Sequence, residues 1–160
     1  MGLLNFLRMK RESTNQYAEK IALEKDYDFM YENFIVSSQQ NLFLFLEENN
    51  GIIETLSFKF KVYKYGYPND EVEIPSKIPG VEIYGISQVF NSDWIKELII
   101  NNRSHSQHSD SFYSNYKHYI VRFKDVTLEV ISKNYEIVKL TKEELDEIIN
   151  KELKYIKNVG

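Results

Sequence analysis

Cysteine is absent from this sequence of 160 residues, which excludes disulfide bonds, thiolate nucleophiles and zinc sites with cysteine ligands. The absence fits a reducing compartment. No stretch approaches the ~20 consecutive apolar residues of a membrane-spanning helix. The apolar run at the N-terminus comes before its basic residues, the reverse of the order in a secretory signal peptide. We therefore predict a soluble, cytoplasmic protein that makes no contact with a membrane.

The sequence also lacks a strong excess of charge of either sign. Its formal net charge of -4 provides no general attraction to nucleic acid, for which a basic surface is typical. Apolar residues make up 42% and charged residues 28%, as in ordinary globular proteins. The three prolines all fall in a loop-rich connection, residues 66–80. The segments that flank it are too short for separate cores, so we predict a single domain, residues 1–160.

Alternation of apolar and polar residues predicts strands in the first half. The run 56–62 carries an apolar residue at every second position, the pattern of a strand with one buried face. The run 42–46 precedes it, and Asn50-Gly51 between the two runs is a strong signal for a two-residue hairpin turn. The resulting register pairs Glu47 with Glu54, Phe45 with Leu56 and Phe43 with Phe58. The first of these pairs brings like charges together, which counts against the register.

A second hairpin is predicted in the C-terminal third. A two-residue turn at Lys124-Asp125 places six apolar residues on one sheet face, as the pairs Tyr119/Val130, Val121/Leu128 and Phe123/Val126. A three-residue loop at residues 133–135 then predicts a further strand, with Val138 opposite Val130. The run 81–87 is expected to add another strand to the same sheet.

Apolar spacing of three and four residues predicts three helices. The longest spans about residues 13–33, with the stripe Tyr17, Ile21, Leu23, Tyr27, Met30 and Phe34. A short middle helix begins at a cap, Asn91 or Ser92, and ends near residues 101–102. A C-terminal helix follows a capping box at Thr141, and its buried stripe is predicted to be Leu145, Ile148, Ile149, Leu153 and Ile156.

Together these elements predict an α+β fold. We expect a mainly antiparallel sheet of about five to seven strands with a long N-terminal-region helix, a short middle helix and a C-terminal helix. The long helix and the C-terminal helix are expected to pack on one side of the sheet.

All three histidines lie in one polar segment, residues 101–118, between the middle helix and the next strand. Six side chains of this segment are candidate ligand-binding residues: Arg103, His105, His108, Asp110, Lys117 and His118. Strand register places His118 on the face opposite the apolar stripe. On that face Arg122 and Glu129 lie diagonally opposite each other, close enough for an ion pair.

Three functions fit the segment. The first is a small soluble binding or regulatory protein that recognises an anionic ligand or partner, because Arg, His and Ser side chains offer many hydrogen-bond donors. The second is a metal-independent phosphodiesterase or nuclease, with His105, His108 and His118 as its candidate catalytic residues. The third is a protein-interaction module of the inhibitor or immunity type, which would use the acidic surface and exposed aromatic side chains.

Motifs for metals and cofactors do not fit the sequence. His105 and His108 are three residues apart with Ser106-Gln107 between them, whereas the His-Glu-x-x-His motif places its histidines four apart around a glutamate. The sequence contains no nucleotide-binding glycine loop. We therefore predict neither a metal site nor a cofactor, and the sequence leaves open whether the protein is an enzyme.

Overall fold

One antiparallel sheet of seven strands forms the frame of the computed structural model, which describes residues 15–30, 33–66, 78–154 and 156. The strand order is β1-β5-β6-β7-β4-β3-β2. The strands are β1 (Tyr17–Lys20), β2 (Ile35–Ser37), β3 (Asn41–Asn49), β4 (Ile52–Gly66), β5 (Gly85–Phe90), β6 (Lys117–Arg122) and β7 (Thr127–Thr141). The helices are α1 (Asp93–Asn102), the 3-10 helix η1 (Asp110–Tyr113) and α2 (Lys142–Leu153). No helix in these ranges is long and apolar enough to cross a membrane.

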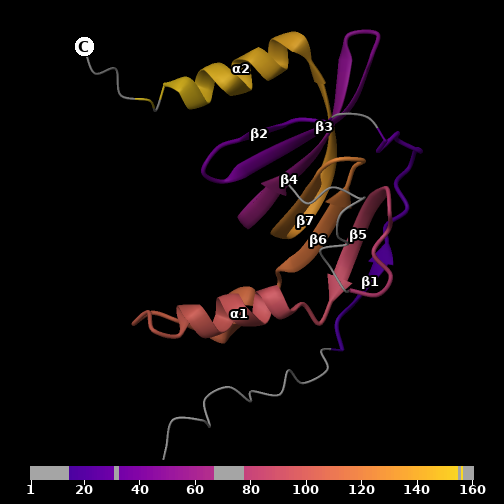
Figure 1. Ribbon diagram of the computed structural model, residues 1–160. Coiled ribbons are helices and arrows are strands. Elements are labelled where there is room, and N and C mark those ends of the chain that lie inside the picture. Colours follow the sequence, from indigo (N-terminus) through magenta and orange to yellow (C-terminus); the bar gives the residue numbers. More distant parts are fainter. Residues whose placement is uncertain (1–14, 31–32, 67–77, 155, 157–160) are drawn as a thin grey trace, which may run out of the picture.

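The two faces of the sheet are covered by different parts of the chain. One face carries the main apolar core, which includes Leu42, Leu44, Leu56, Phe58, Tyr119, Val121, Leu128 and Val130. The segment between β1 and β2 packs on this core through Ile21, Leu23, Tyr27 and Phe29. Both α-helices project from the opposite side, at the two ends of the sheet (Figure 1). The fold thus places the polar segment that follows α1 away from the main core.

The predicted long helix over residues 13–33 is wrong. Tyr17–Lys20 instead pairs with β5, and Tyr17 stacks on Phe90 with ring centroids 5.1 Å apart. After β1 the core contacts come from residues two apart, Ile21 with Leu23 and Tyr27 with Phe29. That spacing belongs to extended chain, whose successive side chains point to opposite sides. Two members of the expected helical stripe, Met30 and Phe34, are exposed.

The β3–β4 hairpin has the predicted turn and begins in the predicted register. Asn49 pairs with Ile52 around Asn50-Gly51, and both turn residues adopt positive φ angles. Glu47 lies opposite Glu54 as expected, but the register then shifts between Phe45 and Glu47. As a result Phe45 faces Thr55 and Leu44 faces Leu56. The shift is a β-bulge, in which one strand inserts an extra residue.

The Glu47/Glu54 pair persists because cations and a hydroxyl surround it. Lys25 forms an ion pair with Glu47 and lies 3.7 Å from Glu54. Lys139, the cross-strand neighbour of Glu54 on β7, reaches its other carboxylate oxygen at 3.0 Å. The Tyr27 hydroxyl donates a hydrogen bond of 2.6 Å to Glu54. These contacts tie the segment before β2 to the middle of the sheet.

The second hairpin confirms one predicted turn and corrects the next. Tyr119 faces Val130 and Val121 faces Leu128, and a turn at residues 124–125 joins β6 to β7. The expected loop at residues 133–135 is wrong, because β7 continues through it as one strand of 15 residues. β4, also 15 residues long, pairs with β7 on both sides of this stretch, so the chain stays in one strand and the register shifts at residues 133–134. The strand expected at residues 81–87 is β5, which begins later, at Gly85.

The middle and C-terminal helices lie where the sequence predicts them. Ser92 caps α1 by accepting a hydrogen bond from the backbone N–H of Ile95, and the capping box of Thr141 with Glu144 starts α2. The predicted burial of the α2 stripe is wrong: α2 has no buried residue, and Leu153 is exposed. The loop-rich connection falls mainly on residues 67–77, outside the described ranges.

The contacts of Glu54 lead to a prediction about stability and pH. Hydrogen bonds from Tyr27 and then from Lys139 lower the pKa of the Glu54 carboxyl. A carboxyl with a lowered folded-state pKa stabilises the fold above its unfolded-state pKa, and this stabilisation disappears as the pH falls through the folded-state pKa. We expect Glu54→Gln to cost about 1–2 kcal/mol at neutral pH and to flatten the loss of stability on acidification.

Urea unfolding from pH 7 down to pH 3 measures both effects. Glu136→Gln, at an exposed position of β7, is the matched control and should leave both unchanged. Equal acid sensitivity of wild type and Glu54→Gln would contradict the assignment.

Candidate functional site

The polar segment leaves α1 at its C-terminal end, forms the short helix η1 and enters the sheet as β6. The six candidate residues therefore come from three kinds of structure. Arg103 caps the end of α1, Asp110 begins η1, and Lys117 and His118 begin β6. His105 and His108 lie in the turns between the helices. The structure brings Arg103, His108 and Asp110 together and separates the other three from them.

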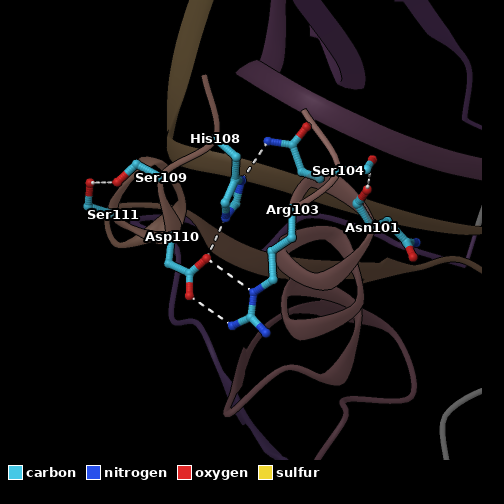
Figure 2. A network of polar contacts seen from close by, with 8 residues as sticks. Asn101, Arg103, Ser104, His108, Ser109, Asp110 and Ser111 are labelled. Carbon is cyan, nitrogen blue, oxygen red and sulfur yellow. Dashed lines mark hydrogen bonds and ion pairs between the residues drawn. The ribbon is translucent and has the colours of Figure 1, made fainter. Parts of the chain in front are cut away.

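Asp110 is the centre of this cluster (Figure 2). Its carboxylate accepts hydrogen bonds from Arg103, from Nη2 at 2.9 Å and from Nε at 3.4 Å. It also accepts a hydrogen bond from Nε2 of His108. The Nδ1 atom of His108 faces the side-chain amide of Asn102 at 3.0 Å. Arg103, His108 and Asp110 are called the Asp110 cluster below.

Arg103 and His108 stabilise the ionised, negatively charged form of Asp110. The hydrogen bond from Arg103, followed by that from His108, lowers the pKa of Asp110 to about 2. In return, the hydrogen bond with Asp110 raises the pKa of Arg103 above its usual value. The side chains of Arg103 and Asp110 are more than half exposed, at 58% and 55%, so water and salt screen their attraction. The cluster is therefore a surface feature that a ligand can reach.

The hydrogen bonds of His105 and His108 limit their ability to act as general bases. An amide NH₂ only donates, so Nδ1 of His108 accepts from Asn102 and its proton sits on Nε2, facing Asp110. Nδ1 of His105 accepts from the backbone N–H of Gln107 at 3.2 Å. A neutral imidazole has one acceptor nitrogen. In His105 and His108 that nitrogen is already occupied, which leaves neither of them a free lone pair for a general base.

His118 is buried under the start of α1. It lies on the sheet face opposite the core, as its register predicts, but only 2% of it is exposed. Its Nδ1 is 2.9 Å from the Ser92 hydroxyl and its Nε2 is 3.1 Å from the Glu129 carboxylate. The Trp94 ring meets the imidazole edge-on at 5.3 Å. His118 therefore fastens α1 to the sheet and does not join the Asp110 cluster.

The protons in this contact can be assigned from its partners. The Ser92 oxygen already accepts from the N–H of Ile95 at 3.2 Å, so its own hydrogen is available for Nδ1 of His118. Nε2–H of His118 then donates to Glu129. Burial raises the pKa of Glu129, but the hydrogen bond from His118 and the charge of Lys64 outweigh that effect and lower it.

The sequence analysis singled out Ser92 and Glu129 but did not predict that both contact His118. Ser92 is a predicted helix cap, and Glu129 lies on the predicted face of His118, but Glu129 was expected to pair with Arg122. The structure pairs Glu129 with His118, because α1 folds over this part of the sheet and excludes water from it. Lys64, the cross-strand neighbour of Glu129, covers the Trp94 ring at 3.9 Å from its centroid. Strand register predicts which face a side chain lies on, but it does not predict whether a helix covers that face.

Serine, histidine and glutamate in series resemble the order of a hydrolytic triad. The resemblance does not extend to function, because Ser92 is only 5% exposed and its oxygen caps α1. A nucleophile has to reach a substrate carbonyl. The three residues have a structural role: they hold α1 against the sheet.

Lys117 and His105 lie outside both groups. Each is exposed, and within the described residues no hydrogen bond or ion pair joins Lys117 to the Asp110 cluster. In the same part of the chain, no three histidine or acidic side chains are placed to hold a metal ion together. Comparisons with protein-family models, curated proteins and solved structures gave no significant match to this chain.

The fastening at His118 predicts a stability effect for its smallest member. We expect Ser92→Ala to lower the free energy of unfolding by about 1–2 kcal/mol, because the substitution removes a helix cap and a buried hydrogen bond together. Urea unfolding followed by Trp94 fluorescence measures it, since the indole lies against His118. Ser92→Thr keeps the hydroxyl and is the matched control. Equal loss in both variants would show that packing, rather than the hydroxyl, is responsible.

Proposed function

We propose that this protein is a small binding or regulatory protein whose Asp110 cluster recognises an anionic group on a ligand or partner. The observation that supports the proposal is the convergence of Arg103 and His108 on one carboxylate at an exposed position. A planar guanidinium and an imidazole N–H around one carboxylate form a common arrangement for binding carboxylate or phosphate groups.

Asp110 occupies the position that such a group would take. Its carboxylate is held by two donors of Arg103 and one of His108, which is the set of contacts that an incoming anion needs. An external anion must therefore displace Asp110 or share Arg103 with it. Because both side chains of the Arg103–Asp110 pair are more than half exposed, water and salt screen their attraction and the displacement costs little. Asp110 therefore lowers the affinity of the site for an external anion but does not prevent binding.

The geometry supports binding better than catalysis. Acid–base cleavage of a phosphodiester needs one histidine with a free lone pair and a second with a proton. The acceptor nitrogens of His105 and His108 are occupied, and His118 is buried with Ser92 and Glu129 on its two nitrogens. The phosphodiesterase function stays a prediction of the sequence with less support than binding.

Exposed apolar side chains beside the Asp110 cluster favour a macromolecular partner over a free ion. Phe112 follows Asp110 by two residues in η1 and is 61% exposed, and Ile100 lies one helical turn before Arg103 at 59%. Aromatic residues and arginine are enriched where proteins meet. This mixture also suits the protein-interaction module, in which an acidic group of the partner would enter the site.

Removing the competing carboxylate tests the proposal. We expect Asp110→Ala to bind inorganic phosphate about two- to fivefold more tightly than wild type, which corresponds to the cost of displacing Asp110. Arg103→Ala should weaken binding by about tenfold, because a bidentate donor is lost. NMR titration of the His108 ring protons with phosphate at constant ionic strength measures each affinity.

Two variants control for net charge. Asp125→Ala removes a carboxylate from the exposed β6–β7 turn, and Lys61→Ala removes a cation from an exposed position on β4. Both should bind phosphate as wild type does. Equal effects of Asp110→Ala and Asp125→Ala would show that phosphate responds only to overall charge, and the site would be rejected.

A further inference from the structure

The two edges of the sheet differ in how they are protected. At one edge, the backbone N–H of Ala18 in β1 donates to the carbonyl of Pro79 at 2.8 Å. Gly80 lies so close that a Cβ there would come within 2.1 Å of the Ala18 carbonyl oxygen. Lys20 and Glu82 add an ion pair of 3.1 Å. Chain and charge therefore cover β1, as edge strands usually are covered.

Among the residues that the structure describes, nothing comparable covers the opposite edge, β2. β2 is the last strand in the sheet order, so no strand of the described residues lies on its outer side. The stretch from Asn33 to Leu46, which contains β2 and most of β3, has no charged residue in a chain that is 28% charged. Proline and lysine, the usual guards of an edge strand, are absent from this stretch.

The register shows which backbone groups β2 presents to the outside. Ser38 donates to the carbonyl of Asn41, and Phe45 donates to the carbonyl of Phe34, so residues 34 and 38 bond inward to β3. Bonding alternates along an antiparallel strand. Val36, paired with Phe43, therefore also bonds inward. Ile35 and Ser37 direct their N–H and C=O groups outward.

These groups match a second copy of the same strand. We propose that β2 pairs with β2 of another molecule of this protein, antiparallel and around a two-fold axis at Val36. Ile35 of each copy then lies opposite Ser37 of the other, and the two pairs exchange four backbone hydrogen bonds. A two-fold axis brings identical side chains together, so an uncharged edge avoids the repulsion that a charged one would create.

A groove beside β2 provides the apolar part of the contact. It has a volume of about 270 Å³ and lies between the sheet and α2; Val36, Phe43 and Ile148 are its apolar lining, and Lys59, Lys151 and Glu152 also line it. Phe34 lies on the same sheet face, stacks on Phe45 and is 58% exposed. In the proposed pairing Phe34 of one copy lies opposite Ser38 of the other. Each Phe34 would thus enter the mouth of the partner groove.

The size of this contact sets its expected strength. A seam of three residues buries less than a standard interface, which places the dimer among weak, transient associations. We expect it to form in the micromolar range of concentration. The proposal does not depend on the Asp110 cluster, which lies near the opposite end of the sheet order.

Analytical ultracentrifugation from low micromolar to submillimolar concentration tests the dimer. Wild type should shift with concentration from 19.1 kDa toward twice that mass. Ser37→Lys should weaken the association by about tenfold or more, because two ammonium groups approach across the axis. Ser106→Lys, at an exposed position in the α1–η1 connection, should behave as wild type. A monomer at every concentration, or equal behaviour of the two lysine variants, would overturn the proposal.

The absence of cysteine permits a second test of the register. Opposed residues at a pair that makes no backbone hydrogen bond lie about 4.5 Å apart at Cα, within the range of a disulfide. The variant Val36→Cys should form a disulfide-linked dimer on mild oxidation, and Ser106→Cys should not. A linked dimer that forms equally in both variants, or in neither, would reject the axis at Val36.

Discussion

The pairing of β7 with both of its neighbours is the constraint on which the rest of the structure depends. Thirteen of the fifteen residues of β7 pair with β4, with the register shifting at residues 133–134, and Thr127–Ser132 also pair with β6. Because β4 pairs with β7 both before and after Lys133-Asn134, the chain stays one strand there and takes up the extra residues as a register shift instead of a loop. β7 also carries Glu129 toward α1 and Lys139 toward Glu54, and it ends at the cap of α2. Its backbone pairing thus positions contacts at both ends of the molecule.

The carboxylates of this fold are of two kinds: some hold other segments against the sheet, and one is exposed on the surface. Glu54 accepts a hydrogen bond from Tyr27, which holds the β1–β2 segment against the sheet. Glu129 accepts one from His118 on the neighbouring strand, and His118 in turn contacts Ser92 at the start of α1. Asp110 receives its bonds from within its own segment and stays exposed. A buried acceptor without a donor costs more than a bond contributes, so the first group is structural. The second group can exchange its partner for a ligand, which is why the proposed function rests on it.

Part of the candidate site was predictable from the sequence. The sequence placed Arg103, His108 and Asp110 in one polar segment, where the structure brings them together, and strand register placed His118 on the face opposite the core. The sequence did not reveal that α1 would cover that face, so a residue expected at a polar surface is buried. Nor did it reveal that Asp110 would hold Arg103 and His108, because a turn between two helices has no periodicity from which to read side-chain directions.

The sequence by itself determined the features that depend on a few neighbouring residues: the Asn50-Gly51 turn, a cap at Asn91 or Ser92, the cap at Thr141, and the apolar stripe of β6 and β7. Turn angles and cap hydrogen bonds involve neighbours along the chain. Tertiary structure decided whatever depended on a distant partner. Residues 17–20 form a strand because β5 offers an edge, and the register shift near Phe45 arises in the pairing of β3 with β4. Helical spacing in the early segment was overruled because pairing and core contacts stabilise extended chain more than local preference stabilises a helix.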